Sequence, residues 1–396
     1  MMKAGIVQRI FLDHYERYAS ERPVSNRERR WAAWNIQTCQ TAQQGYHVDE
    51  CPNGDYRIIL CNSCKHRSCP LCGAIETELW LQRRKLQALS CRYFHIIFTI
   101  DHELHCIWRW NRKMFTDFML RGAWHTLREL LRDPHWLGAV PGAIGVFQSW
   151  DDEMQEHCHL HFIMTAGGLA PDGRWIAANG EFLLPTPVLA SKFRGKFLAY
   201  LREGFKEVSP RGKTKEQVLV PPAGKSVQQC LNIINKVGRK RWHADIEPAY
   251  EHAEGTYKYV GRYIRRGPIS EKRIVSYDGE NVRIAYAHPD KHTNRTFAFT
   301  AQTFIRRVLS HVPEKGTHVV RSYGLFHPNC RGKLDDARAR LGQPPYEPLT
   351  ELPSVQELLS RMFPEWQGIV CPRCGALLRT IYVYHRGHAP PMRRAA

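Results

Sequence analysis

The sequence predicts an α+β fold spread over more than one domain, and three observations support this expectation. The chain has 396 residues, which is more than one hydrophobic core usually holds. Strand-like and helix-like segments follow one another without the regular alternation that builds a doubly wound parallel sheet. Cysteines gather near the N-terminus, and a further CxxC pair lies close to the C-terminus. We therefore expect a mixed central region flanked by two cysteine-bearing regions.

The strand-like segments are clearest in the central region. Residues 93–100 form a compact β-branched and aromatic run, which is typical of a buried strand. Residues 142–150 and 157–165 have a similar character and are joined by a short acidic turn, which predicts an antiparallel pair. A second hairpin is expected where Asp278-Gly279 separates residues 273–277 from 282–286. The spacing predicts helices at residues 5–20, 108–131, 254–266 and 301–312.

Composition and cysteine content set the expected domain boundaries. Residues 1–92 are rich in cysteine and should form an N-terminal zinc-binding module that contacts DNA. Residues 93–312 should hold the main α+β domain. Residues 313–396 form a Pro-rich C-terminal region that ends in the second CxxC pair.

The charge balance indicates a polyanionic partner. The chain has 57 Lys and Arg against 38 Asp and Glu, a formal net charge of +19, and nucleic acid is the commonest partner of so basic a protein. The N-terminal apolar stretch is too short for a signal peptide, and no run is long enough for a membrane-spanning helix. We expect a cytoplasmic protein, associated with the nucleoid when bound to DNA, whose cysteines are metal ligands or buried thiols.

Two closely spaced CxxC turns predict a structural zinc site in the N-terminal module. Each turn can present two thiolates to one tetrahedral ion. Lys65 and Arg67 lie between the two turns and could contact phosphate. The favoured ligand set is Cys51, Cys64, Cys69 and Cys72, with Cys39, His47 and Cys61 as substitutes or as part of a second site.

The segment His157-Cys-His-Leu-His161 predicts a second, different metal site. Histidines that alternate along a strand emerge on one face, where two of them can share a divalent ion such as Mg²⁺ or Mn²⁺. Gln148 is the favoured third ligand, because an antiparallel pairing would place it beside His159; Asp152 and Glu153 are its rivals. The competing interpretation is a set of hydrogen-bonded histidines on a half-exposed sheet.

Tyr259 and Tyr263 are candidate nucleophiles. They are four residues apart, so a helix would place both on one face. A phenol has a pKa near 10 and needs nearby cations before it can attack a phosphodiester. Such cations are present in the same segment, although tyrosines at this spacing also occur in helix cores: Lys258, Arg262, Arg265 and Arg266.

Taken together, these motifs resemble the two-tyrosine transposases of bacterial insertion sequences that move by a rolling-circle route, a branch of the HUH endonucleases. The similarity covers the His-Leu-His strand, the Tyr-x-x-x-Tyr segment, the cysteine run 61–72, the strand 93–104 and residues 321–325. The resemblance implies a central antiparallel sheet with the histidine strand in its middle and helices on one side. It also implies that residues 93–312 are the catalytic domain. The chain departs from the family pattern at residues 52–54, where many members have a second cysteine.

The resemblance further implies a mechanism. His159 and His161 would ligate the catalytic ion, and Tyr259 or Tyr263 would attack single-stranded DNA at the ends of a mobile element to form a 5′-phosphotyrosine. Target DNA would then be joined in the reverse reaction.

Three competing functions stay open at this level. A replication initiator or relaxase would use the same chemistry, a zinc-dependent DNA-binding regulator would use none, and a metal-dependent hydrolase would form no covalent adduct. In the C-terminal region, a further zinc site is expected from Cys371, Cys374, His385 and His388.

Overall fold

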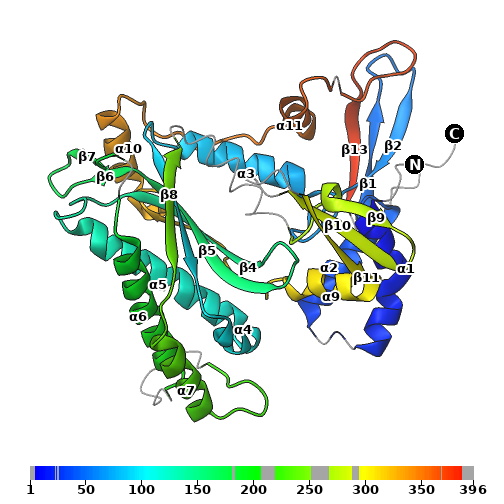
Figure 1. Ribbon diagram of the computed structural model, residues 1–396. Coiled ribbons are helices and arrows are strands. Elements are labelled where there is room, and N and C mark those ends of the chain that lie inside the picture. Colours follow the sequence, from blue (N-terminus) through cyan, green and yellow to red (C-terminus); the bar gives the residue numbers. More distant parts are fainter. Residues whose placement is uncertain are drawn as a thin grey trace, which may run out of the picture.

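The computed structural model describes residues 5–22, 24, 26–180, 183–206, 219–250, 267–287, 294–366 and 368–385. It confirms the α+β fold class, and its centre is a five-stranded sheet of order β12-β4-β5-β3-β8 in which neighbouring strands are antiparallel (Figure 1). The strands are β3 (Tyr93–Thr99), β4 (Gly142–Trp150), β5 (Glu156–Thr165), β8 (Ala244–Tyr250) and β12 (Val320–Gly324). The histidine strand β5 lies in the middle of the sheet, as the resemblance implied.

One face of this sheet is covered by helices. The side chains of Phe94, Phe98 and Phe162 alternate along the strands and enter one apolar core. The helices that cover this face are α4 (His105–Trp110), α5 (Arg112–Arg132), α6 (Thr186–Gly204) and α7 (Val227–Gly238). A small two-stranded sheet, β6 (Gly167–Leu169) with β7 (Trp175–Ala177), extends the end of β5.

The opposite face is covered over only part of its area, which refines the expectation of helices on a single side. Helices α3 (Gly73–Gln87) and α10 (Arg331–Arg340) pack over Ile144 and Ile163. Further along the same strands, the positions on this face are Gln148, His159 and His161. Burial of the apolar positions on this face is favourable, which explains why helices cover them. The polar positions further along do not need that cover.

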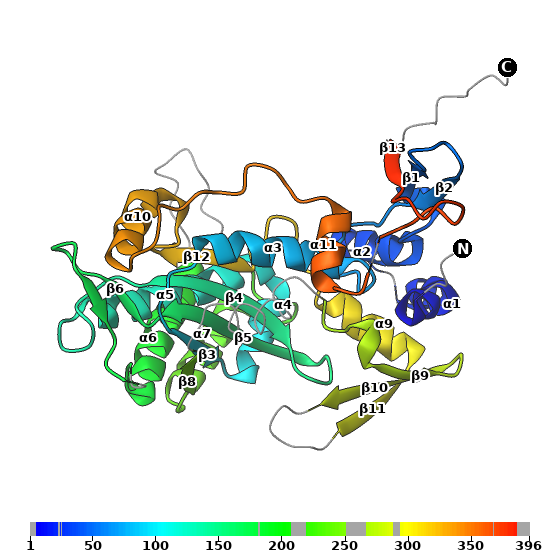
Figure 2. The same cartoon turned by 90° about the horizontal axis from the view of Figure 1, so that it is seen from above.

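A second lobe joins the first helices of the chain to a later segment (Figure 2). Helices α1 (Ile6–Glu21) and α2 (Arg27–Thr38) pack with α9 (Ala301–Ser310) through Phe11, Ile36 and Phe304. The sheet β11-β10-β9 completes this lobe, with strands β9 (Ile274–Tyr277), β10 (Asn281–Ala287) and β11 (Asn294–Thr300). The hairpin expected at Asp278-Gly279 is present, and Gly279 takes the left-handed φ of 105° that the turn requires.

A third, small sheet brings the two ends of the chain together. Strand β1 (Gly45–Glu50) pairs with β2 (Arg57–Cys61) on one side and with β13 (Arg379–His385) on the other, so the red strand lies beside the blue ones in Figure 1. Helix α11 (Val355–Met362) precedes β13. The three expected sequence regions remain predictions as domains, but strand pairing crosses both of their boundaries, since β12 and β13 complete sheets begun earlier in the chain.

Short 3-10 turns connect several of these elements, at Ala42–Gln44, His102–Leu104, Glu271–Arg273 and Pro328–Cys330. Among the described residues, no helix combines the length and the apolar character needed to cross a membrane.

Candidate functional site

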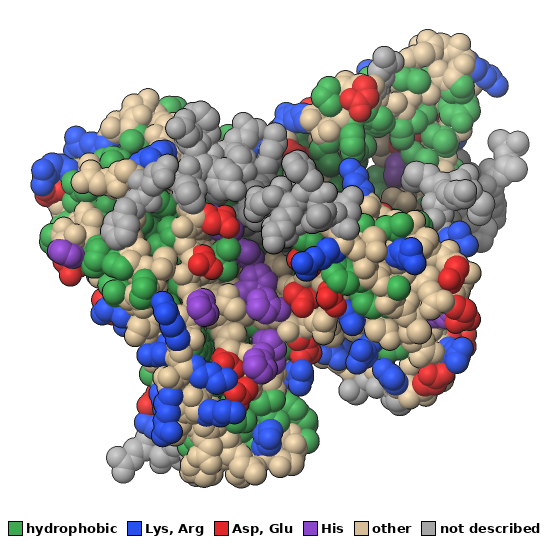
Figure 3. Space-filling view, viewed as in Figure 1, with side chains coloured by type: hydrophobic (Ala, Val, Ile, Leu, Met, Phe, Trp, Pro, Cys, Tyr) green, Lys and Arg blue, Asp and Glu red, His purple; other side chains and the backbone are tan. Residues whose placement is uncertain are grey.

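The central strand β5 presents its histidines on the partly uncovered face of the sheet. His159 lies opposite Gln148 of β4 and Thr99 of β3, and His161 lies one pleat further along on the same face. The two imidazole centroids are 4.8 Å apart. In the space-filling view, histidines gather in the hollow between the two lobes (Figure 3). The strand therefore brings two ligands together on one face, where each histidine is 8% exposed.

A hydrogen-bonded relay fixes the ring of His161. The Nδ1 atom of His95 is 2.7 Å from Oε2 of Glu247, and its Nε2 is 2.9 Å from Nδ1 of His161. The carboxylate can only accept, so His95 donates from Nδ1. In the tautomer that carries only this proton, Nε2 of His95 accepts from Nδ1 of His161. His161 then carries its proton on Nδ1, and its Nε2 has the lone pair that a metal ion needs.

His159 has the same tautomer for a different reason. Its Nδ1 donates to the backbone carbonyl of His157 at 2.9 Å, which again leaves Nε2 as the basic nitrogen. Burial lowers the pKa of His159 to about 4 and the pKa of His161 well below its ordinary value. Both rings are consequently neutral at physiological pH, which is the state in which imidazole binds metal.

Gln148 supplies an oxygen beside these two nitrogens. Its amide nitrogen donates to the carbonyl of Trp150 at 3.2 Å. Its Oε1 is buried and accepts no hydrogen bond from any residue that the structure describes. A buried oxygen in that situation is unfavourable unless something else coordinates it. These three groups fit a divalent ion that takes nitrogen and oxygen ligands.

The acidic rivals of Gln148 lie in the turn beyond β4. Asp152 is exposed and Glu153 is half-buried. The backbone carbonyl of Glu153 accepts from Arg307 of α9, and that of Asp152 accepts from Arg273. The turn thus contacts the second lobe through its backbone. Asp152 and Glu153 come after the end of β4, whereas the residue opposite His159 is Gln148.

Sequence reasoning missed two members of this site, His95 and Glu247. His95 points to the same face of its strand as Tyr93. The signal available in the sequence was a single histidine within an otherwise apolar strand. It is fully buried. Glu247 had no such signal, because its position beside His95 depends on the pairing of β8 with β3 between residues 152 positions apart.

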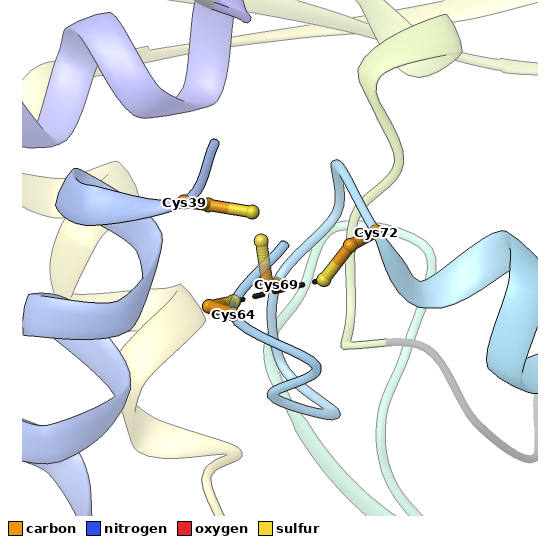
Figure 4. Close-up of side chains that lie close together, drawn as sticks. All are labelled: Cys39, Cys64, Cys69 and Cys72. Carbon is orange, nitrogen blue, oxygen red and sulfur yellow. Dashed lines mark hydrogen bonds between the residues drawn. The ribbon is translucent and has the colours of Figure 1, made fainter. Parts of the chain in front are cut away.

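A separate cluster of four thiols lies at the apolar core of the second lobe. Cys39 follows α2, Cys64 and Cys69 lie in the loop before α3, and Cys72 is the residue that precedes α3. The four side chains point toward one another (Figure 4), and their sulfur atoms all lie within 4.8 Å of one another. Four sulfurs around one centre match the closed, tetrahedral set that structural zinc takes.

This grouping corrects the favoured ligand set, in which Cys51 stood in place of Cys39. Strand β1 leads away from Cys39, and β2 returns antiparallel to it, so Cys51 lies at the far turn of the hairpin. Cys61 and His47 also lie outside the cluster. Cys61 is opposite Tyr46 in the sheet, and Nδ1 of His47 is 2.9 Å from the side-chain oxygen of Asn62.

The electrostatics of the four thiols favour a bound cation. Hydrogen bonding with Cys64 lowers the pKa of the Cys39 thiol. Hydrogen bonding with Cys39 raises the pKa values of Cys64 and Cys69. Thiolates at these separations repel one another unless a positive ion lies between them.

The structure places the remaining candidates as follows. Lys65 is exposed, and Arg67 is half-buried and lines a pocket with Arg112 between the lobes. His385 pairs with Gly45, at the end of β1 opposite to Cys51, and is not grouped with Cys371 and Cys374. Seven candidates, with the helix expected at 254–266, lie outside the described residues: Lys258, Tyr259, Arg262, Tyr263, Arg265, Arg266 and His388.

Comparison with known proteins defines the class. A family model described as "Putative transposase" matches residues 142–333, which include the histidine strand, and a model described as "Transposase zinc-binding domain" matches residues 10–100, which include the four-thiol cluster. No solved structure matches the chain. The matched segments are thus those of a transposase with an N-terminal zinc-binding domain.

Two relatives extend this result over the whole chain. A "Putative transposase y4qJ" of Sinorhizobium fredii is 31% identical over 397 residues, which cover 96% of both chains. The "Transposase for insertion sequence element IS801" of Pseudomonas savastanoi pv. phaseolicola is 26% identical over 287 residues, covering 70% of this chain and 63% of the relative. The chain belongs to the two-tyrosine transposase family of bacterial insertion sequences. Its match to a zinc-binding domain supports structural zinc at the four-thiol cluster.

Proposed function

We propose that this transposase cuts and rejoins single-stranded DNA through a 5′-phosphotyrosine, with a divalent ion held by His159, His161 and Gln148. The observation that carries the proposal is the arrangement of the two histidines, whose hydrogen bonds leave both Nε2 atoms as electron-pair donors beside the buried Gln148 oxygen. Structural histidines satisfied within the sheet would not require that arrangement.

A bound Mg²⁺ or Mn²⁺ would supply Lewis-acid polarisation of the scissile phosphate. The protein's own groups would set the geometry around it. Glu247 orients His95, which orients His161, and the backbone of β5 orients His159. Ligands held in place in this way lower the entropic part of the activation barrier, because the reacting groups are already oriented.

In the proposed reaction, the phenolic oxygen of Tyr259 or Tyr263 forms a bond to the phosphorus, and the bond from phosphorus to the 3′ oxygen breaks. The tyrosine proton is lost, and the departing 3′ oxygen takes up a proton to become a hydroxyl. Because the phosphodiester bond energy is kept in the phosphotyrosine, a 3′-hydroxyl of target DNA can attack it and restore the tyrosine without ATP. Lys258, Arg262, Arg265 and Arg266 would contribute charge for phosphate contacts.

The proposal includes transposition of a mobile element by a rolling-circle route. A replication initiator or relaxase would share the chemistry, but family membership favours a transposase. A regulator without catalysis is disfavoured by the buried histidine relay, which positions ligand nitrogens and has no evident role in DNA binding.

The test uses a single-stranded oligonucleotide from the end of the protein's own element, labelled at its 3′ end, with the full-length protein and Mg²⁺. We expect the label to migrate with the protein under denaturing conditions, and the adduct to disappear when Tyr259→Phe and Tyr263→Phe are combined. Cleavage by the double variant, or cleavage without an adduct, would replace the proposal with hydrolysis by activated water.

A further inference from the structure

The turn after β1 and the turn before β13 have the same internal hydrogen bonding. In the first, the backbone N–H of Cys51 donates to the carbonyl of Tyr56, five residues on; in the second, Cys371 donates to Ala376, also five residues on, both at 2.8 Å. In each turn the N–H two residues after the cysteine donates to its sulfur, from Asn53 and from Arg373, both at 3.4 Å. The two turns therefore share one backbone arrangement, although they lie near opposite ends of the sequence. We call each of them a knuckle.

The sulfurs of these knuckles meet at one end of the small sheet. Sγ of Cys51 is 3.4 Å from Sγ of Cys374. Together with Cys371 and a carboxylate oxygen of Asp55, they form a group whose ligand atoms all lie within 4.8 Å of one another. The side-chain amide of Asn53 also donates to the Cys374 sulfur at 3.6 Å, which would stabilise a thiolate.

The two knuckles differ at one position. The second has cysteines at its first and fourth residues, Cys371 and Cys374, whereas the fourth residue of the first is Gly54, with a left-handed φ of 76°. Asp55, the next residue, brings its carboxylate to the place that a fourth thiolate would occupy. Zinc accepts carboxylate oxygen as well as thiolate sulfur.

The sheet around this group has little core of its own. Its buried cluster consists of Cys51, Cys371 and Leu378, with a few half-buried neighbours. Ile59 and Val383, on β2 and β13, are 65% and 52% exposed. So small an apolar cluster cannot hold the C-terminal strand against the entropy of the chain without an added cross-link. A disulfide would use only two of the three thiols and is rare in the cytoplasm.

We infer that Cys51, Cys371 and Cys374, with Asp55 as the fourth ligand, form a second structural zinc site that fastens the C-terminal strand β13 to the N-terminal zinc-binding domain. The site is independent of the proposed catalytic function. It would make residues 368–385 part of the N-terminal module in space, and metal binding there would contribute directly to folding.

The test measures zinc in the purified full-length protein by elemental analysis. We expect two zinc ions per chain, and one in Cys371→Ser and in Cys374→Ser, whereas the control Cys330→Ser keeps two. Asp55→Ala should keep the second ion but bind it at least about tenfold more weakly in a chelator competition, since it loses one of four ligands.

A second readout guards against misfolding of the cysteine variants. After replacement of zinc by Co²⁺, the thiolate charge-transfer absorption of the wild-type protein should correspond to seven cysteine ligands. Four belong to the four-thiol cluster that includes Cys39, called the Cys39 cluster below, and three belong to the second site. One zinc per chain in fully loaded wild-type protein would overturn the inference. So would a disulfide between Cys51 and Cys374 found by mass spectrometry, or unchanged zinc in Cys371→Ser.

Discussion

The histidine face of the central sheet and the Cys39 cluster are both sites where ligands converge, but they are built in opposite ways. The cluster offers four sulfurs, one from the end of α2 and three from the loop and the cap residue before α3, and this set completes a tetrahedron. The histidine face offers two neutral nitrogens and one amide oxygen on neighbouring strands of one sheet, on the face that helices cover over only part of its area. A closed set holds a fold together, whereas an open set leaves coordination positions for a substrate and for water.

The largest effect is expected at the open site. His159→Ala or His161→Ala should reduce DNA cleavage at least about 1,000-fold, because losing the ion removes about 4 kcal/mol of transition-state stabilisation. Zinc content and DNA binding should persist, since binding depends on distributed phosphate contacts. His157→Ala, on the same strand, is the control and should cleave within a few-fold of wild type. Near-normal cleavage by His161→Ala would remove β5 from the active site.

The closed site should respond in stability. Cys39→Ser should lose the zinc of the cluster, lower the free energy of unfolding by more than about 4 kcal/mol and weaken DNA binding, because structural zinc contributes to folding. Cys61→Ser is the matched control, since Cys61 lies in a CxxC turn but outside the cluster. Thermal unfolding and zinc analysis of both variants give the answer. Retained zinc in Cys39→Ser, with loss in Cys61→Ser, would reverse the assignment.

Variants of Gln148 should show whether the third ligand of the ion comes from β4 or from the turn that follows it. Gln148→Ala should slow cleavage by about 100-fold and raise the Mg²⁺ concentration needed for half-maximal rate, because one ligand of the ion is lost. Asp152→Ala and Glu153→Ala should be near neutral. The reverse ranking would transfer the third ligand to the turn.

A smaller effect is expected from Glu247, which positions His95 and through it His161. Glu247→Ala should weaken metal binding and lower activity by about tenfold or slightly more, as is usual for partners of a metal-bound histidine. Glu247→Gln keeps an oxygen that can accept from His95 and should recover part of that loss. If both variants change only stability, and not the Mg²⁺ dependence of the rate, the relay has no role in metal binding.

Much of the site could be predicted from local sequence pattern, and the rest depended on long-range pairing. The alternation in residues 157–161 predicted a histidine face, and the antiparallel pairing of β4 with β5 placed Gln148 beside His159. The choice of Cys39 over Cys51 could not be made from spacing, because it depends on the direction in which β1 leaves α2. The partnership of Cys51 with Cys374 joins residues 323 positions apart, and no local pattern indicates it.

One measurement tests the difference between the two kinds of site most directly. The protein is dialysed against a chelator mild enough to remove Mg²⁺ and Mn²⁺ but not tightly bound zinc, and its zinc content and single-strand cleavage are measured before and after Mg²⁺ is returned. We expect unchanged zinc throughout, no cleavage without Mg²⁺ and full cleavage once it is restored. Cleavage by zinc-loaded protein in the absence of Mg²⁺ and Mn²⁺ would contradict the assignment of an exchangeable catalytic ion to the histidine face.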